Sequence, residues 1–266
     1  MPDCLTMPFV SMIEKIFVSN FHHWGSLNNS VFNRGRVWFA CTGIASADLN
    51  MAWSEKPITR DDTDALIFAK NEFLRRNLPF WWWVFPSTRS ETAERLLREE
   101  GLPFIKSTPC MVADLAFVTG TSTPDPPLNV ICVENRHDRD LWEAVSFSGF
   151  GFTPDTKQQY HRFVTAFDSG GNSHYKLLLG RIGENAVATA MLFMENDLSG
   201  IYFLTTSADK RRQGIGLAMT QAAMQAAKNY GARFAVLQSS PEGYRVYRRA
   251  GFEECCRIDV YGEQDA

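Results

Sequence analysis

The sequence predicts an α/β protein of the α+β kind, in which a mixed, mostly antiparallel sheet is flanked by helices. Apolar and β-branched runs of strand length alternate with helical stretches along the whole chain. Three successive strand-like runs in the second half are joined by tight turns, which favours antiparallel pairing. One order of elements (strands, helix, apolar strand, short helix, glycine, strand) occurs in both halves, so we expect two similar domains.

A stretch of proline and small polar residues, TGTSTPDPP at 119–127, separates the two halves. Because prolines and short polar side chains sustain neither a helix nor a strand ladder, this stretch is predicted to be an extended linker. The domains on either side of it, 1–118 and 128–266, are each within the usual size range.

In the first half, strands and helices alternate. The predicted strands are 36–45, 47–53, 80–85, a short run near 104, and 111–118, and the predicted helices are 61–76 and 91–100. Ser90 and Gly101 are residue types that begin and end the second of these helices. The run Trp81–Trp83 lies between prolines and is interpreted as buried strand core or a subunit contact.

The second half contains more strands than the first. Its predicted strands are 129–134, 176–182, 187–195, 200–206, 234–238 and 252–261, and its predicted helices are 138–147, 155–167, 213–230 and 242–249. One face of the third helix carries small and apolar side chains at helical spacing and is predicted to pack on the core: Met219, Ala222, Ala223 and Ala226.

The composition is that of an ordinary globular protein. The 266 residues are 45% hydrophobic and 21% charged, and the formal net charge is −3. This balance offers no dense basic field, so neither a nucleic acid nor an anionic membrane is expected as a partner. No apolar run reaches the roughly 20 residues that span a bilayer, and Pro8 and Glu14 make the N-terminal stretch a poor signal peptide.

Cysteine and histidine spacing predicts neither a disulfide framework nor a metal site. The six cysteines include no C-x-x-C pair, and the five histidines do not stand at metal-ligand spacing. We therefore expect a cytoplasmic protein with reduced thiols and no metal, whose histidines are structural or lie on the surface.

The most informative segment is LTTSADKRRQGIG at 204–216, which joins a predicted strand to a predicted helix. Gly214 and Gly216 have no Cβ, so the backbone can approach a bulky anion closely. The first N–H groups of the following helix lack intrahelical partners and lie at the positive end of its dipole. With Lys210, Arg211 and Arg212 beside them, these amides predict a cradle for a diphosphate.

Two familiar phosphate loops fit this segment poorly. A Walker loop requires Gly-Lys followed by Ser or Thr, which the segment lacks. A dinucleotide fingerprint requires a third glycine, where Met219 stands, and a βαβ unit, whereas this helix is predicted to follow an antiparallel run.

A third interpretation rests on two motifs in order. The R-x-x-G-x-G run at 211–216 resembles the coenzyme A loop of the GNAT N-acyltransferase superfamily, and the strand before it also fits that family's pattern. The family then has a short strand and a helix with a tyrosine, followed by Gly-Phe. Here FAVLQ and Tyr247-Arg248-Arg249-Ala250-Gly251-Phe252 match. The resemblance covers roughly 129–261 and departs from the family where Ser240 and Gly243 replace a common Asn and Ala.

The resemblance implies an acyl-CoA N-acyltransferase fold and direct attack of an amine on acetyl-CoA within a ternary complex. The residues that it assigns to cofactor binding are Leu204, Thr205, Thr206, Arg211, Arg212, Gln213, Gly214, Ile215, Gly216 and Ser240. Tyr247 matches the family's general acid, which protonates the leaving thiolate. The general base is unassigned, with Glu195, Asp197 and a water relay as alternatives.

The resemblance extends to the first half only loosely. SEKPITRD stands where the coenzyme A loop would follow the strand ending at Trp53, so 1–118 is predicted to be a degenerate acyltransferase-like domain. The acceptor amine, a small molecule or a peptide, is left open, as is a homodimer. The alternative function is a non-catalytic acyl-CoA sensor, which would keep the phosphate loop and not depend on Tyr247.

Overall fold

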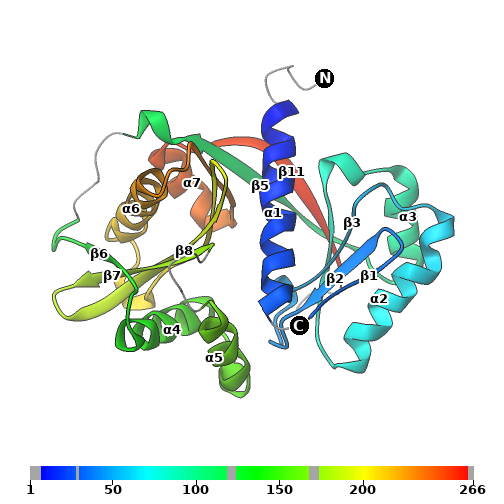
Figure 1. The fold of residues 1–266 in the computed structure, drawn as a ribbon, viewed down its shortest axis with the longest axis horizontal. Coiled ribbons are helices and arrows are strands. Elements are labelled where there is room, and N and C mark those ends of the chain that lie inside the picture. Colours follow the sequence, from blue (N-terminus) through cyan, green and yellow to red (C-terminus); the bar gives the residue numbers. More distant parts are fainter. Residues whose placement is uncertain (1–6, 28–29, 119–123, 168–173, 263–266) are drawn as a thin grey trace. The chain divides into compact units, whose positions relative to one another are not determined.

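The computed structural model describes residues 7–27, 30–118, 124–167 and 174–262 (Figure 1). The helices are α1 Met7–Leu27, α2 Thr63–Arg75, α3 Glu91–Glu99, α4 Arg136–Phe150, α5 Lys157–Ala166, α6 Ile215–Asn229 and α7 Pro241–Ala250. The strands are β1 Val31–Arg34, β2 Val37–Cys41, β3 Asn50–Ser54, β4 Trp81–Val84, β5 Phe104–Asp114, β6 Asn129–Cys132, β7 Tyr175–Ile182, β8 Asn185–Glu195, β9 Leu198–Thr206, β10 Phe234–Gln238 and β11 Glu253–Gly262. None of these helices is long and apolar enough to cross a membrane.

Most predicted elements are present, and the largest difference is α1, which was not predicted. Its buried side chains Ile13, Ile16, Phe17 and Phe21 recur at helical spacing. Of the predicted strand 36–45, only Val37–Cys41 form a strand, β2. It pairs with β1, which was not predicted, across a turn at Gly35, where φ is +61°. The two strands predicted near 104 and at 111–118 are the single strand β5. Of the predicted linker, 119–123 lie outside the described residues and 124–127 belong to no helix or strand.

The chain divides into two compact units, and each is described by itself. Unit 1 comprises Met1–Ile16 and Cys110–Cys255, and unit 2 comprises Phe17–Pro109 and Cys256–Ala266. These bounds differ from a single division at 119–127, because the boundaries lie inside α1, β5 and β11.

In unit 1, a mixed sheet lies between two layers of helices. Strand β10 pairs antiparallel with β5 and parallel with β9, and β8, β7 and β6 follow in antiparallel order. Helices α6 and α7 cover one face, and α4 and α5 the other (Figure 1). Three residues of the predicted α6 stripe pack on the core: Met219 and Ala223 are fully buried in one cluster with Ala190, Leu192 and Ile201, and Ala226 packs on it. The fourth, Ala222, is half-buried and does not belong to that cluster.

In unit 2, strands β1, β2 and β3 pair antiparallel, β3 pairs parallel with β4, and β4 pairs antiparallel with β11. Side chains of α2 and α3 bury one face of this sheet around Phe73, Trp82 and Leu97. On the other face, the Phe17 and Phe21 rings of α1 lie 5.1 Å from Trp83 and 5.8 Å from Trp53. The whole run Trp81–Trp83 is buried, as predicted for strand core.

The two halves of the chain repeat one order of elements. An antiparallel pair leads through a helix to a parallel strand, a short helix and a long last strand, as β2-β3-α2-β4-α3-β5 and as β8-β9-α6-β10-α7-β11. Each last strand ends in the other unit: β5 pairs with β10 at 110–114, and β11 pairs with β4 at 259–262. The predicted mixed sheet flanked by helices, with a repeated arrangement, is therefore present.

One topological prediction was wrong. Strand β9 pairs antiparallel with β8 as expected, but β9, α6 and β10 form a βαβ unit, because β10 lies parallel to β9. The argument against a dinucleotide fingerprint therefore depends on Met219 at the third glycine position rather than on topology.

Unit 2 contains a buried amide that ties three segments together. Asn50 is fully buried, and its Nδ2 donates to the carbonyl oxygens of Ile44 at 2.7 Å, Ser46 at 3.0 Å and Pro79 at 2.9 Å. Its Oδ1 accepts from the backbone N–H of Thr42 at 3.0 Å.

We expect Asn50→Ala to lower the free energy of unfolding by about 3–5 kcal/mol, because it leaves several buried backbone groups without partners. Urea denaturation measures the loss. Asn33→Ala is the control, because Asn33 is exposed and makes one 3.4 Å bond to Gly35 O. That variant should change stability by less than about 0.5 kcal/mol. Equal effects of the two substitutions would show that the Asn50 bonds do not stabilise unit 2.

Candidate active site

The predicted cofactor residues lie where two parallel strands separate. Strand β9 pairs with β10 at Leu198–Gly200, in register with Phe234–Val236. Beyond these pairs β9 continues to Thr206 and β10 to Gln238 with no further register between them, while β5 pairs with the whole length of β10 on the other side. The last residue of β9 that pairs with β10, among the described residues, is Gly200. Leu204–Thr206 therefore belong to a later part of β9 that is not paired with β10. Because the carboxyl ends of parallel strands lie at one sheet edge, the loops that begin α6 and α7 meet at that edge.

A β-bulge shapes this part of β9. The register pairs Met191 with Tyr202 but Thr189 with Thr205, so β9 has one extra residue opposite β8. Phe203 takes a φ of +48°, which is unusual for a side-chain-bearing residue. Buried Thr189 Oγ1 donates to the Phe203 carbonyl at 2.9 Å, and this bond holds the bulge.

The bulge also decides which face each side chain of β9 points to. Ile201 packs with α6, and strict alternation would place Phe203 on the same face. Instead the Phe203 ring lies 5.8 Å from Trp142 of α4, and Leu204 packs on the α6 side. Thr205 lies against Gly149 of α4. A Cβ atom added to Gly149 would be only 2.5 Å from Thr205 Oγ1, so the two residues are in close contact.

The start of α6 has no side-chain cap. Gly214, at the N-cap position, has a φ of +81°, and no acid stands in the first turn. Arg212 is also left-handed, at +65°, and its side chain is exposed. Gly216 lies close to β9, since a Cβ there would be 3.8 Å from Thr206 Oγ1. The predicted cradle thus has helix amides and no protein anion at the helix start.

The loop's long side chains differ in their contacts. Arg211 donates from Nε to Thr206 O and from a terminal nitrogen to Gly149 O, both at 3.2 Å, and so ties β9 to α4. Gln213 Nε2 donates to Asp209 O at 3.2 Å. Lys210 Nζ lies 3.6 Å from the Asp209 carboxylate. In this arrangement Arg211 braces the loop, while Arg212 is exposed.

The corresponding helix of unit 2 begins differently. At the start of α2, the Asp62 carboxylate accepts from Thr59 N at 2.8 Å and lies 3.2 Å from Arg36 Nε. Asp64 stands in the first turn. The positive end of α2 therefore already has carboxylates of the chain itself, whereas that of α6 has none in its first turn.

Helix α7 places Ser240 and Tyr247. Ser240 is its N-cap, and its Oγ accepts from Gly243 N at 3.1 Å. Tyr247 packs on the core beside Phe252, at a ring distance of 6.1 Å. Burial raises the pKa of Tyr247 to about 12. Gly243 leaves room for this ring, because a Cβ at 243 would lie 2.6 Å from Tyr247 Cε2.

The two candidate bases lie far from this edge. Glu195 ends β8 and Asp197 lies in the turn that precedes β9, so both stand at the opposite end of β9 from Thr206. Nine residues of strand extend over roughly 25–30 Å. The structure thus separates both carboxylates from the α6 and α7 loops and leaves the water relay as the alternative.

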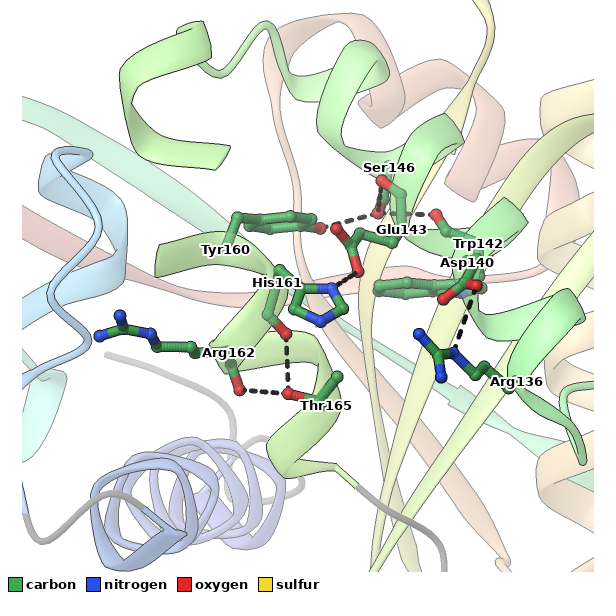
Figure 2. Close-up of polar contacts among 9 residues, drawn as sticks. All are labelled: Arg136, Asp140, Trp142, Glu143, Ser146, Tyr160, His161, Arg162 and Thr165. Atoms are coloured by element: carbon green, nitrogen blue, oxygen red, sulfur yellow. Dashed lines mark hydrogen bonds and ion pairs between the residues drawn. The ribbon is translucent and has the colours of Figure 1, made fainter. Parts of the chain in front are cut away.

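Sequence reasoning missed the polar contacts between α4 and α5, which Figure 2 shows. Tyr160 Oη donates to Ser146 Oγ at 2.7 Å, and both residues are fully buried. His161 Nδ1 lies 2.8 Å from Glu143 Oε2 (Figure 2). Burial raises the pKa of Tyr160, so its hydroxyl stays protonated. Residues on two separate helices carry no spacing signal, so the sequence offered no way to pair them.

Within the described ranges, no group of three or more His, Cys, Asp or Glu side chains could hold a metal ion.

Comparisons with known proteins found a family model and similar folds. Residues 147–261 match the family described as Acetyltransferase (GNAT) domain. No curated protein sequence matches the chain. A GCN5-related N-acetyltransferase from Kribbella flavida has a similar structure, with 18% identity, a TM-score of 0.70 and coverage of 94% of this chain and 96% of that chain.

Two further structures share the fold. A GCN5-related N-acetyltransferase from Sphaerobacter thermophilus has 15% identity and a TM-score of 0.65, and covers 86% of this chain and 76% of its own. A tandem GNAT protein from the clavulanic acid biosynthesis pathway has 11% identity and a TM-score of 0.57, over 86% of this chain and 79% of that chain. At these identities the likeness concerns the fold.

Two first-turn glycines give a matched test of the geometry around Tyr247. Gly243→Ala should lower the free energy of unfolding by about 1–3 kcal/mol, because its Cβ would overlap the Tyr247 ring. Gly216→Ala, whose Cβ would be in ordinary van der Waals contact with Thr206 Oγ1 at 3.8 Å, should be neutral or stabilise by up to about 1 kcal/mol. Thermal and urea denaturation measure both. If Gly243→Ala were as stable as Gly216→Ala, the Tyr247 ring would not lie over Gly243.

Proposed function

We propose that this chain, whose residues 147–261 match the GNAT acetyltransferase domain, transfers an acetyl group from acetyl-CoA to the nitrogen of an amine. One observation carries the proposal. Three features lie at one edge of the sheet: the uncapped start of α6, the end of β9 beyond its last pair with β10, and the start of α7. Helix α7 also carries Tyr247.

Binding of the diphosphate falls to the loop before α6. Backbone N–H groups of Gln213–Gly216 donate to it, assisted by the helix dipole and the exposed Arg212. Arg211 keeps the loop in place through Thr206 O and Gly149 O, and exchanges one of these carbonyls for a phosphate oxygen. The residues fit the group because no chain carboxylate occupies the first turn of α6.

Acetyl-CoA would supply an activated thioester carbonyl at the end of a long arm that contains amides. The backbone of Leu204–Thr206 pairs with this arm as a strand would, in the place that β10 vacates. A backbone N–H of the same stretch donates to the thioester carbonyl oxygen and stabilises its developing charge. Ser240 Oγ accepts from Gly243 N, which leaves its hydroxyl proton for a hydrogen bond to the arm.

The reaction needs one proton at the leaving sulfur. The amine nitrogen forms a bond to the carbonyl carbon, the carbon–sulfur bond breaks, and the thiolate takes the proton of Tyr247 Oη. The product nitrogen loses its proton to water. Water in turn returns a proton to the Tyr247 oxygen, so Tyr247 ends the cycle protonated. A phenol whose pKa is raised to about 12 is protonated at neutral pH, so the proton is present when the thiolate forms. Because a thiol is the stronger acid, with a pKa of about 8.5, the raised pKa makes this transfer harder than it would be from an ordinary tyrosine.

We extend the proposal to the organisation of the chain, with cofactor binding in 128–266 and a degenerate first half in 1–118. The Asp62 carboxylate supports it, because a negative side chain at the start of α2 opposes a second phosphate there.

The decisive variant is Tyr247→Phe. We expect kcat to fall about 100-fold or more, since general acid catalysis contributes that much, while the Kd for acetyl-CoA stays within twofold. Thiol release from acetyl-CoA over an amine panel and calorimetry give the two numbers. Tyr230→Phe, at the far end of α6, is the control and should change neither. Tight acetyl-CoA binding with no thiol release on any amine would identify the sensor function instead.

The pH profile of kcat tests the state of Tyr247. A pKa raised from 10 to about 12 keeps the phenol protonated, so its acid form is lost only as the pH approaches 12. We therefore expect no alkaline fall in kcat up to about pH 10.5. A fall in kcat centred near pH 9 that Tyr247→Phe abolishes would contradict the raised pKa.

A further inference from the structure

Five aromatic rings gather on the α4 side of the β9 bulge, and we call them the aromatic wall: Phe147, Phe150, Phe152, Tyr160 and Phe203. The Phe150 ring stacks on Phe152 at 6.0 Å and meets the Phe203 ring edge-on at 5.5 Å. Tyr160 lies 4.9 Å from Phe152 and 5.5 Å from Phe147. The rings come from α4, α5, β9 and the turn after α4.

One ring of the wall is open to solvent. Phe150, the last residue of α4, is 42% exposed, whereas Phe203 and Tyr160 are buried. An aromatic side chain left exposed forgoes the burial of a large apolar surface. Phe150 contacts the Phe152 and Phe203 rings and leaves part of its own surface uncovered, so it presents an apolar face to solvent.

The position of Phe150 relative to β9 is also fixed. Its neighbour Gly149 packs directly on Thr205, and Gly149 O accepts from Arg211. Trp142 Nε1 donates to Ala190 O of β8 at 3.1 Å, and Tyr160 Oη donates to Ser146 Oγ, which secures α4 against the sheet and α5 (Figure 2). The open ring therefore borders the stretch of β9 to which we assign the thioester carbonyl.

From this juxtaposition we propose that the acceptor is a primary amine that carries an aromatic group on a short arm, and that Phe150 is the residue that selects it. The inference rests on the proposed function. The acceptor ring stacks on the open face of Phe150, and its arm brings the nitrogen to the carbonyl carbon beside Thr205. The amine then displaces the thiol as described above, with the same balance of bonds and protons.

The test compares two primary amines on the same two-carbon arm, 2-phenylethylamine and 2-aminoethanol, with full-length protein. Thiol release from acetyl-CoA gives kcat and KM, and calorimetry in the presence of coenzyme A gives the affinity for each amine. We expect kcat/KM for 2-phenylethylamine to exceed that for 2-aminoethanol by about 100-fold, as the loss of a large apolar group from a pocket produces.

Variants assign the preference to Phe150. Phe150→Ala should raise KM for 2-phenylethylamine about tenfold, with less than twofold change for 2-aminoethanol and for acetyl-CoA. Phe150→Tyr keeps the ring and should restore the wild-type KM. Phe117→Ala is the control, because Phe117 is 80% exposed and lies outside the aromatic wall.

The possible failures are distinguishable. Equal turnover of both amines, or a preference that Phe150→Ala leaves intact, overturns the aromatic acceptor and keeps the acetyltransferase. Absence of thiol release with every amine overturns the proposed function. In that case the affinity for 2-phenylethylamine, measured by calorimetry, decides whether an aromatic amine binds at Phe150. Binding of 2-phenylethylamine that Phe150→Ala weakens about tenfold supports the aromatic site, and no binding overturns it.

Discussion

The separation of β9 from β10 after three residue pairs is the constraint on which the candidate site depends. Backbone N–H and C=O groups of a strand need partners, and the end of β9 has lost one neighbour. The bulge at Phe203 increases the local twist and bends the strand. Thr189 and Trp142 donate hydrogen bonds to carbonyl groups on either side of the bulge and so hold an unfavourable backbone conformation in place.

The corresponding helices of the two halves, α2 and α6, differ in the charges at their N-termini. At α2, Asp62 places a carboxylate beside the positive end of the helix and pairs with Arg36. At α6, Gly214 offers no side chain, and the charged residues that precede it are mainly basic. The N-terminus of a helix attracts anions because it is the positive end of the helix dipole. Where no carboxylate of the chain lies there, a ligand anion can bind; where one does, it repels a ligand anion. This difference in charge supports the proposal that the loop before α6 binds a phosphate and that the loop before α2 does not.

The fold also explains why the chain resists division into two consecutive segments. Strand β5 begins in unit 2 and ends as the partner of β10, while β11 ends as the partner of β4. Each βαβ unit thus pairs with a strand that the other half supplies. Helix α1 has residues in both units, with Phe9 against Phe234 in unit 1 and Phe17 against Trp83 in unit 2. A fragment cut at 119–127 would therefore leave β10 without its antiparallel neighbour.

The sequence by itself predicted most of the helices and strands, although not α1 or β1, and the motif that we propose to bind phosphate, because these depend on local chemistry. Helix starts, glycine positions and the order from Arg211 to Phe252 act over short stretches, and each is visible in one segment. Only the tertiary structure decided the bulge, because it depends on the pairing of Thr189 with Phe203, fourteen residues apart. The same holds for the rings that meet at Phe150, the Glu143–His161 contact and the exchange of β5 and β11. These features arise from contacts between distant segments, and no residue spacing along the chain records which segments will meet.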